Sequence, residues 1–232
     1  MDFFDQYNDK LYELSQEYGL INLLSIDRHY KDGGYWNRFA KLKAVEQYID
    51  GYNYHLLYEI QSLSNQVHFG ILNCLLFRPL ISVERIEPNV YNHRLTFMIE
   101  STIHGIYAYW NRIALLLNLY LNNPLAKEKV YMSKIFRLIK KEYIEVKNID
   151  GYKWLDNLMA DFEFFRRNEM THNYYILMQE FLPHPHQTKV DYDLLIQKLV
   201  YHNNAISKDV YKLLDLLDYL EVDSNKKNKN NF

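Results

Sequence analysis

The chain of 232 residues carries 27 basic and 29 acidic side chains, for a formal net charge of −2, and 48% of its residues are hydrophobic. This length and apolar content suit one domain with a sizeable core, or one domain with a small appendage. The near-neutral charge excludes a global basic field for indiscriminate nucleic-acid binding, so any nucleic-acid site must be a local patch.

Glycine and proline are scarce, at 7 and 5 residues, and this favours long helices over many short strands. The single cysteine, Cys74, excludes an intramolecular disulfide and fits a reducing compartment, and its apolar neighbours predict a buried structural thiol. The longest apolar stretch, residues 113–117, is far shorter than the ~20 residues that span a bilayer. We therefore expect a cytoplasmic protein without a membrane partner.

Apolar residues recur at helical spacing along most of the chain, which predicts an all-α fold. In chain order, the pattern predicts a helix over 2–17, an irregular stretch over 18–37, a helix over 38–77 bent near Gly51 or Gly70, and helices over 92–121, 127–147, 152–168 and 190–221. We expect three parts: an N-terminal helical extension packed on the core (1–37), an up-and-down helical bundle ending in a long C-terminal helix (38–222), and a disordered polar tail (223–232).

One octapeptide, residues 167–174, gathers residues suited to phosphate chemistry: Arg167, Asn168, His172 and Tyr174. Arginine offers a permanently charged fork of donors to a phosphate, and histidine exchanges a proton near neutral pH. At about 100° per residue, Arg167 and His172 fall on different faces of an ideal helix, whereas Asn168 and His172 share one. This spacing suits a helix end, or a pocket to which two protomers each contribute half.

The order R-N-x-x-x-H-x-Y resembles the RNxxxH active-site motif of the HEPN superfamily, many of whose members are metal-independent ribonucleases. HEPN domains are bundles of four to five helices, with the motif between two late helices and one long C-terminal helix after it. The resemblance covers residues 40–222 in architecture and 167–174 in specific residues. The segment from Tyr174 to Asp191 is longer than in compact members, so the resemblance does not describe the rim of the site.

The resemblance implies RNA cleavage by attack of the ribose 2′-hydroxyl, with no metal and no other cofactor. His172 would act as general base or acid, Arg167 would bind the scissile phosphate, and Asn168 would orient His172 or hold the phosphate. Such enzymes are homodimers with a composite site, and many are toxins or phage-defence effectors. Tyr174 resembles the tyrosine that a nucleotidyltransferase-type antitoxin adenylylates; alternatively, Tyr174 is a packing residue. The antitoxin could also be a different product of a neighbouring gene.

Two further groups are candidates for supporting roles. Glu100 and His104, four apart on a predicted helix, are expected either to support His172 or to form a structural hydrogen-bonded pair. Lys134, Arg137 and Lys141 share a helix face that either tracks an RNA backbone or is an ordinary solvated face. Asp156, on the helix before the motif, is expected to be a surface residue.

Three alternatives to an active ribonuclease remain open from the residues. Arg166 and Arg167 can place their positive charges at the C-terminal end of the preceding helix, where the helix dipole is negative, so the motif can be purely structural. The chain can be a catalytically inactive HEPN module that binds a nucleotide or a protein partner, or a metal-dependent helical enzyme that uses its histidines. No Gly-rich phosphate loop, H-E-x-x-H or Cys-x-x-Cys occurs, which argues against a nucleoside triphosphatase or a dinucleotide enzyme.

Overall fold

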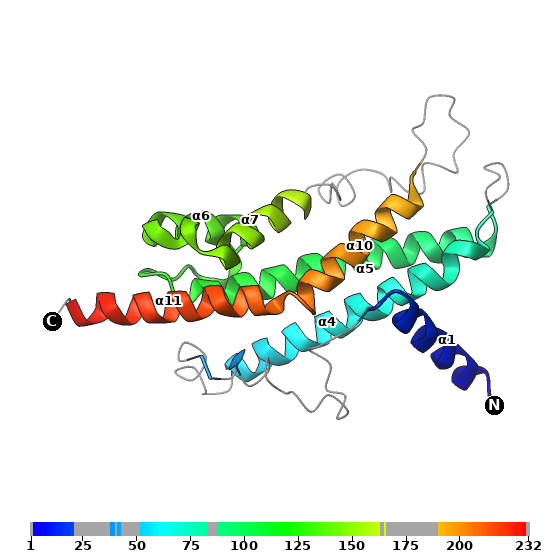
Figure 1. Cartoon of the computed structure of the whole chain (residues 1–232), viewed down its shortest axis with the longest axis horizontal. Coiled ribbons are helices and arrows are strands. Elements are labelled where there is room, and N and C mark those ends of the chain that lie inside the picture. The colour runs from blue at the N-terminus through cyan, green and yellow to red at the C-terminus, as the bar shows by residue number, and fades with distance from the viewer. Residues whose placement is uncertain are drawn as a thin grey trace.

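Helices pack as an all-α bundle, with no β-strand among the residues that the structure describes, so the predicted fold class is confirmed (Figure 1). The structure is a computed structural model that describes residues 2–20, 38–39, 41–42, 52–82, 88–162, 165 and 190–230, with the backbone alone at 52–54 and 225–230. The α-helices are α1 (Phe3–Glu17), α4 (Tyr52–Phe77), α5 (Val90–Asn118), α6 (Met132–Glu142), α7 (Asp150–Phe162), α10 (Tyr192–Ile206) and α11 (Val210–Asn230).

Helix α1 begins and ends with local capping and packs against α4. The Asp2 carboxylate accepts a hydrogen bond from the Asp5 backbone N–H, and the Asp5 side chain accepts one from Asp2 in return. Gly19, with φ of 56°, ends the helix in the left-handed conformation that glycine adopts without steric cost. Leu11 and Leu14 are buried, and the Tyr7 hydroxyl donates to Asn73 Oδ1 on α4 at 2.7 Å.

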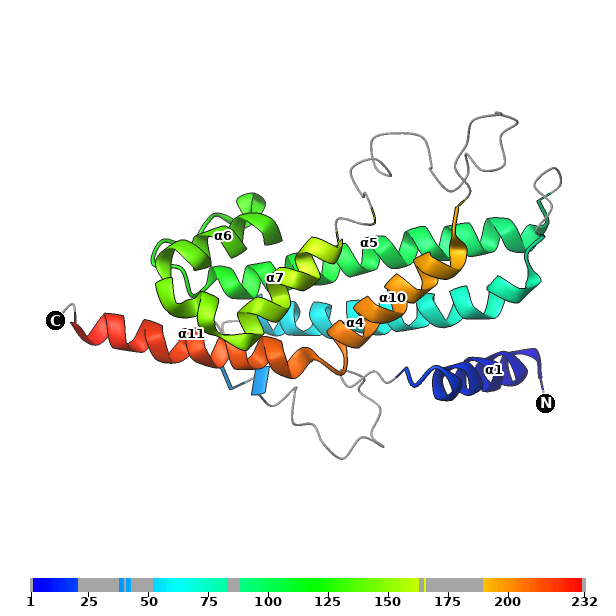
Figure 2. The same cartoon turned by 45° about the horizontal axis from the view of Figure 1, so that its top comes forward.

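Helices α4 and α5 run side by side in opposite directions and form the centre of the bundle (Figures 1 and 2). They approach closely at Gly70, where a Cβ atom would lie 2.2 Å from the Thr102 Oγ1 atom. Helix α4 continues through Gly70 to Phe77, so it is not broken at this glycine; Gly51 lies outside the described residues. Gly70 instead allows close helix packing. Cys74 is buried in this core, as predicted, and burial raises the pKa of its thiol to about 12.

The predicted continuous helix over 127–147 is wrong. Two short 3₁₀ segments, Lys127–Lys129 and Ile144–Asn148, flank the 11-residue helix α6. The backbone is extended at Val130 and Tyr131, which ends the first segment. At Tyr143 the backbone leaves the helical region, and the buried tyrosine hydroxyl donates to the Tyr120 backbone oxygen. Tertiary contacts of these residues override a helical pattern that is continuous in the sequence.

Helix α7 packs on α6, α5 and α11, and its described residues end earlier than the predicted end at 168. Gly151 lies so close to α11 that a Cβ atom would be 2.2 Å from the Lys212 backbone oxygen. Phe136 of α6 stacks on Tyr152 with a centroid separation of 4.3 Å. The helix ends at Phe162, and Phe165 is buried beyond it. Residues 166–168 lie outside the described residues.

The predicted single helix over 190–221 is also wrong, because two helices, α10 and α11, occupy this stretch (Figure 1). The chain turns between them at Ser207, whose hydroxyl donates to the Asn203 backbone oxygen at 2.8 Å, while the Asp209 N–H donates to the Asn204 backbone oxygen at 2.9 Å. Helix α10 then lies on α4 and α5, and α11 lies on α7. Helix α11 extends to Asn230.

Candidate functional site

The octapeptide lies outside the described residues, so Arg167, Asn168, His172 and Tyr174 have no described geometry. The described residues include the two helices that flank the octapeptide in the chain, which we call its supports. Helix α7 and Phe165 precede the octapeptide, and α10 follows after Val190. These supports meet in one cluster of charged and aromatic side chains.

This cluster joins the C-terminal end of α7 to α10 through Asp161. The Asp161 carboxylate forms an ion pair with the Lys198 ammonium and accepts a hydrogen bond from His202 Nε2 at 3.2 Å. Lys198 and His202 are four residues apart on α10 and therefore share a face. A carboxylate in the last turn of α7 is unfavourable against the negative end of the helix dipole, and the lysine charge offsets this cost.

Aromatic rings enclose His202, whose side chain has no exposed area. Its ring centroid lies 5.0 Å from that of Phe162 and 5.3 Å from that of Phe165. Burial lowers the pKa of His202 to about 4, against the opposing attraction of Asp161. The imidazole is therefore neutral at neutral pH, with its proton on Nε2 facing the carboxylate, and Nδ1 has no hydrogen-bond partner among the described residues.

Buried polar groups continue from His202 toward α4. Asn203 is 1% exposed and its side chain acts on His68 of α4, while Asn203 Nδ2 and His68 Nδ1 have no hydrogen-bond partner among the described residues. Burial lowers the pKa of His68, so this imidazole is also held neutral. The α10 face against α4 is thus polar near its C-terminal end, immediately before the turn at Ser207. Sequence reasoning missed this cluster, although His202-Asn203-Asn204 is a visible polar interruption in an apolar helical pattern.

Glu100 and His104 do not form the expected buried pair. Glu100 is buried and its Oε1 atom has no hydrogen-bond partner among the described residues, whereas His104 is exposed. At about 100° per residue, the buried face of α5 is centred on Ile99 and Ile106, and Glu100 lies at its edge. His104 lies roughly 40° farther round and so points away from the core. Burial raises the pKa of Glu100 to about 7.

Lys134, Arg137 and Lys141 lie on one face of α6, opposite its buried face, as their spacing predicts. Arg137 and Lys141 are exposed, and Lys134 is half-buried. The Arg137 Nε atom donates a long hydrogen bond of 3.4 Å to the Ser133 backbone oxygen, and Arg137 forms no ion pair with any described residue. Its terminal nitrogen atoms can therefore receive an anion.

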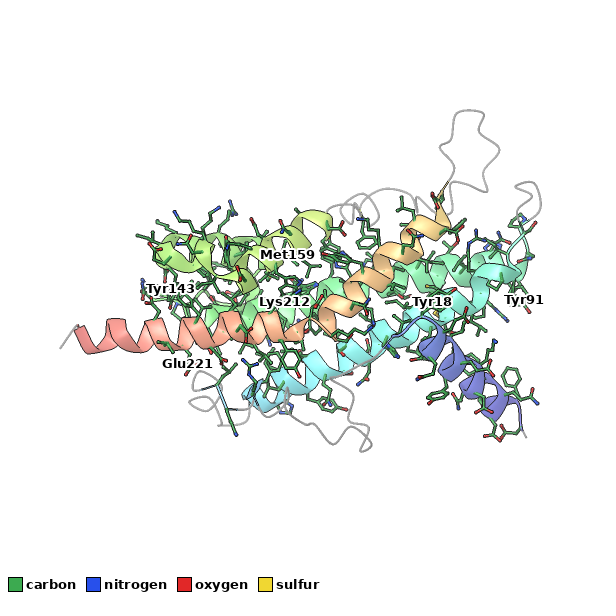
Figure 3. The ribbon with its side chains drawn as sticks, in the orientation of Figure 1. Tyr18, Tyr91, Tyr143, Met159, Lys212 and Glu221 are labelled. Carbon is green, nitrogen blue, oxygen red and sulfur yellow. The ribbon has the colours of Figure 1, made fainter. Side chains whose placement is uncertain are left out.

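A cavity of about 600 Å³ lies between α5, α6 and α7, beside Arg137. Met159, labelled in Figure 3, lies on its α7 wall. Five of the twelve lining residues are aromatic, and Asp156 and Arg137 are the two charged ones. The full set is Tyr107, Trp110, Asn111, Tyr131, Met132, Ser133, Phe136, Arg137, Asp156, Met159, Ala160 and Phe162. Phe162 thus contacts both this cavity and His202. The cavity is within the size range of small-molecule sites in proteins.

Among the described residues, no group of three or more His, Cys, Asp or Glu side chains is placed to hold a metal ion. In the same part of the chain, no helix has the length and apolar character needed to cross a membrane. Comparison with protein-family models, with curated proteins and with solved structures finds no match to this chain.

Proposed function

We propose that this chain is a metal-independent endoribonuclease of the HEPN type, acting as a toxin or phage-defence effector in the cytoplasm. The observation that carries the proposal is the octapeptide 167–174, in which Arg167, Asn168, His172 and Tyr174 stand in the order of the RNxxxH motif. The all-α bundle is the fold that such a motif requires, and the motif follows α7 and precedes α10 in the chain.

His172 removes the proton from the ribose 2′-hydroxyl, which then attacks the adjacent phosphorus atom. Arg167 binds the scissile phosphate and stabilises the negative charge that develops on its oxygen atoms. The bond from phosphorus to the 5′-oxygen breaks, that oxygen takes a proton from water, and the protonated His172 returns its proton to the solvent. The products are a 2′,3′-cyclic phosphate and a 5′-hydroxyl, and Asn168 orients His172 or holds the phosphate.

The Asp161 cluster supports the proposal because it fixes both ends of the chain segment that contains the motif. Asp161 lies six residues before Arg167, and Lys198 and His202 lie on the helix that follows the motif. Precise placement of catalytic groups depends on such rigid flanking elements. This cluster joins α7 to α10 through the two polar contacts of Asp161.

The spacing of Arg167 and His172 favours a homodimer in which the motifs of two protomers meet at a two-fold axis. A toxin of this kind needs restraint by an antitoxin from a neighbouring gene, and adenylylation of Tyr174 would supply it if that antitoxin is a nucleotidyltransferase. Lys134 and Lys141, with Arg137, would guide the RNA backbone along α6.

The test is incubation of the full-length protein with total cellular RNA in excess EDTA, followed by analysis of the fragment ends. We expect the wild type to yield 2′,3′-cyclic phosphate ends, and Arg167→Ala and His172→Ala to lower the rate at least about 100-fold, the usual size of a general-acid–base contribution. His55→Ala, which changes an exposed histidine of α4, is the matched control and should cleave like the wild type. Circular dichroism shows whether each variant keeps its helical content.

Intact RNA with wild-type protein of unmodified mass would overturn the proposal and favour a silent binding module. If the mass of the intact protein shows adenylylated Tyr174, Tyr174→Phe is assayed in its place, and intact RNA with that variant has the same meaning. Cleavage that EDTA abolishes would favour a metal-dependent enzyme instead.

A further inference from the structure

The cavity between α5, α6 and α7 combines flat apolar surface with two opposite charges that do not neutralise each other. The Arg137 guanidinium and the Asp156 carboxylate both line it, both residues are exposed, and neither forms an ion pair with a described residue. A protein gains little stability from such a pair of separate charges on one cavity. Their arrangement suits a ligand that is anionic at one end and carries hydrogen-bond donors at the other.

Five aromatic side chains share the rest of the wall with Asn111, Met132, Ser133, Met159 and Ala160. Tyr107 and Phe162 line the cavity in contact with each other, with ring centroids 4.1 Å apart, and Phe162 also contacts His202. Tyr131 leaves 57% of its area exposed and is thus available to cover a ligand. Aromatic surfaces of this kind stack on nucleic-acid bases, whichever base is present.

The charged groups add selectivity to this stacking surface. An ionised carboxylate only accepts hydrogen bonds, and guanine presents two adjacent donors, N1–H and the exocyclic amino group, on its pairing edge. Adenine presents one donor beside an acceptor there and cannot satisfy a carboxylate in the same way. Arginine binds phosphate with two parallel hydrogen bonds.

We propose that this cavity binds a guanine nucleotide of an RNA strand, with the base stacked on the aromatic wall, its pairing edge on Asp156 and its phosphate on Arg137. The assignment to RNA rests on the proposed ribonuclease function and gives that enzyme a preference for sites near guanine. Phe162 links the cavity to the cluster that precedes the motif, so the bound guanine lies on the α7 support of the site.

Calorimetric titration of the full-length protein tests the binding without any cleavage. We expect 5′-GMP to bind at least about tenfold more tightly than 5′-AMP, the discrimination typical of a bidentate contact to a base. Asp156→Asn should reduce this preference to within about twofold, and Arg137→Gln should weaken both nucleotides about tenfold. Asp150→Asn and Lys147→Gln change exposed charges away from the cavity and should leave both affinities as in the wild type.

Short RNA strands distinguish the two sources of a guanine nucleotide. With the His172→Ala protein, a hexamer of adenosines with one central guanosine should bind more tightly than the all-adenosine hexamer, and Asp156→Asn should abolish the difference. If 5′-GMP binds but the hexamers bind equally, the cavity takes a free nucleotide and the RNA assignment is wrong. If neither nucleotide is preferred, the guanine assignment is wrong.

The fate of the cavity and the fate of the ribonuclease proposal are separable. Guanine-selective binding together with intact RNA in the cleavage assay would support the cavity proposal and overturn the ribonuclease proposal. Cleavage with no guanine near the cut sites, unchanged by Asp156→Asn, would retain the enzyme and overturn the cavity assignment.

Discussion

Burial moves the protonation of two single residues in opposite directions. The pKa of Glu100 is raised from 4.5 to about 7, because its carboxyl group is buried without a compensating hydrogen bond at Oε1. The pKa of His202 is lowered from 6.5 to about 4, because its imidazole is fully enclosed. Near neutral pH the folded protein therefore holds His202 uncharged, and it holds Glu100 in both protonation states.

These shifts have opposite effects on stability. Between pH 4.5 and about 7 the folded protein retains the Glu100 proton that the unfolded chain releases, so this contribution is complete below pH 4.5 and is lost as pH rises through about 7. Between pH 6.5 and about 4 the unfolded chain binds the His202 proton that the folded protein rejects, so that contribution is complete above pH 6.5 and is lost as pH falls through about 4. The two slopes oppose each other over pH 4.5–6.5.

Glu100→Gln should therefore change the pH dependence of stability. Glutamine keeps the size of the protonated carboxyl group and does not titrate, so only the opposing histidine slope remains. We expect the free energy of unfolding of the variant to rise more steeply between pH 5 and 7 than that of the wild type, by up to about 1.4 kcal/mol per pH unit. Urea unfolding at a series of pH values measures this, and parallel curves for the two proteins would show that Glu100 titrates normally.

At the scale of the helices, the close contact of α4 with α5 depends on the missing side chain of Gly70. A Cβ atom there would lie 2.2 Å from Thr102 Oγ1, whereas a Cβ atom at Gly105 would lie 3.1 Å from a Val67 methyl group. We expect Gly70→Ala to lower the free energy of unfolding by about 2 kcal/mol through overpacking. Gly105→Ala, the matched control, should cost far less because alanine also favours the helix.

The double variant Gly70→Ala, Thr102→Ala identifies the cause of the cost. The Thr102→Ala change removes both the hydroxyl and the Cγ2 methyl group and leaves the Cβ atom, 3.3 Å from the new methyl group. The double variant should recover part of the lost stability, with a coupling energy of about 1 kcal/mol or more in denaturant unfolding. Additive losses would instead attribute the effect of Gly70→Ala to contacts other than Thr102.

Hydrophobic periodicity predicted helices throughout, but it did not predict where tertiary contacts interrupt them. The breaks at Val130–Tyr131, Tyr143 and Ser207 involve no glycine or proline. The Tyr143 hydroxyl donates instead to the Tyr120 backbone oxygen, and the Ser207 hydroxyl donates to the Asn203 backbone oxygen in the last turn of α10. Gly70 shows the converse case, because a residue that normally signals a break here permits close packing. Local pattern does not distinguish these uses of a residue.

In the candidate site, too, some residues could be predicted from the local sequence and others are brought together only by tertiary packing. The octapeptide was visible because its residues are adjacent in the chain, and Arg137 was selected for its charge and helical position. Asp161, Lys198 and His202 come together only through the packing of α7 on α10, and Asp156 joins the cavity only through the packing of α6 on α7. Sequence spacing within one helix cannot reveal either group.

At the scale of the whole molecule, the homodimer that we propose would extend the site beyond one chain. On an ideal helix the spacing of Arg167 and His172 would place them on different faces, and a second copy across a two-fold axis could then complete the site. Each of the two sites of such a dimer takes its arginine from one protomer and its histidine from the other. A site formed within one protomer would instead take both from the same chain.

Heterodimers purified through two different affinity tags distinguish these arrangements. A dimer of Arg167→Ala with His172→Ala has one intact site if the sites are shared, because one site receives both substitutions and the other receives neither; we expect about half of the wild-type activity per dimer. A dimer of wild type with the Arg167→Ala, His172→Ala double variant should be inactive, since each of its sites then lacks one residue. Sites formed within single protomers would reverse both results, so the pair of heterodimers gives opposite outcomes for the two arrangements in one cleavage assay.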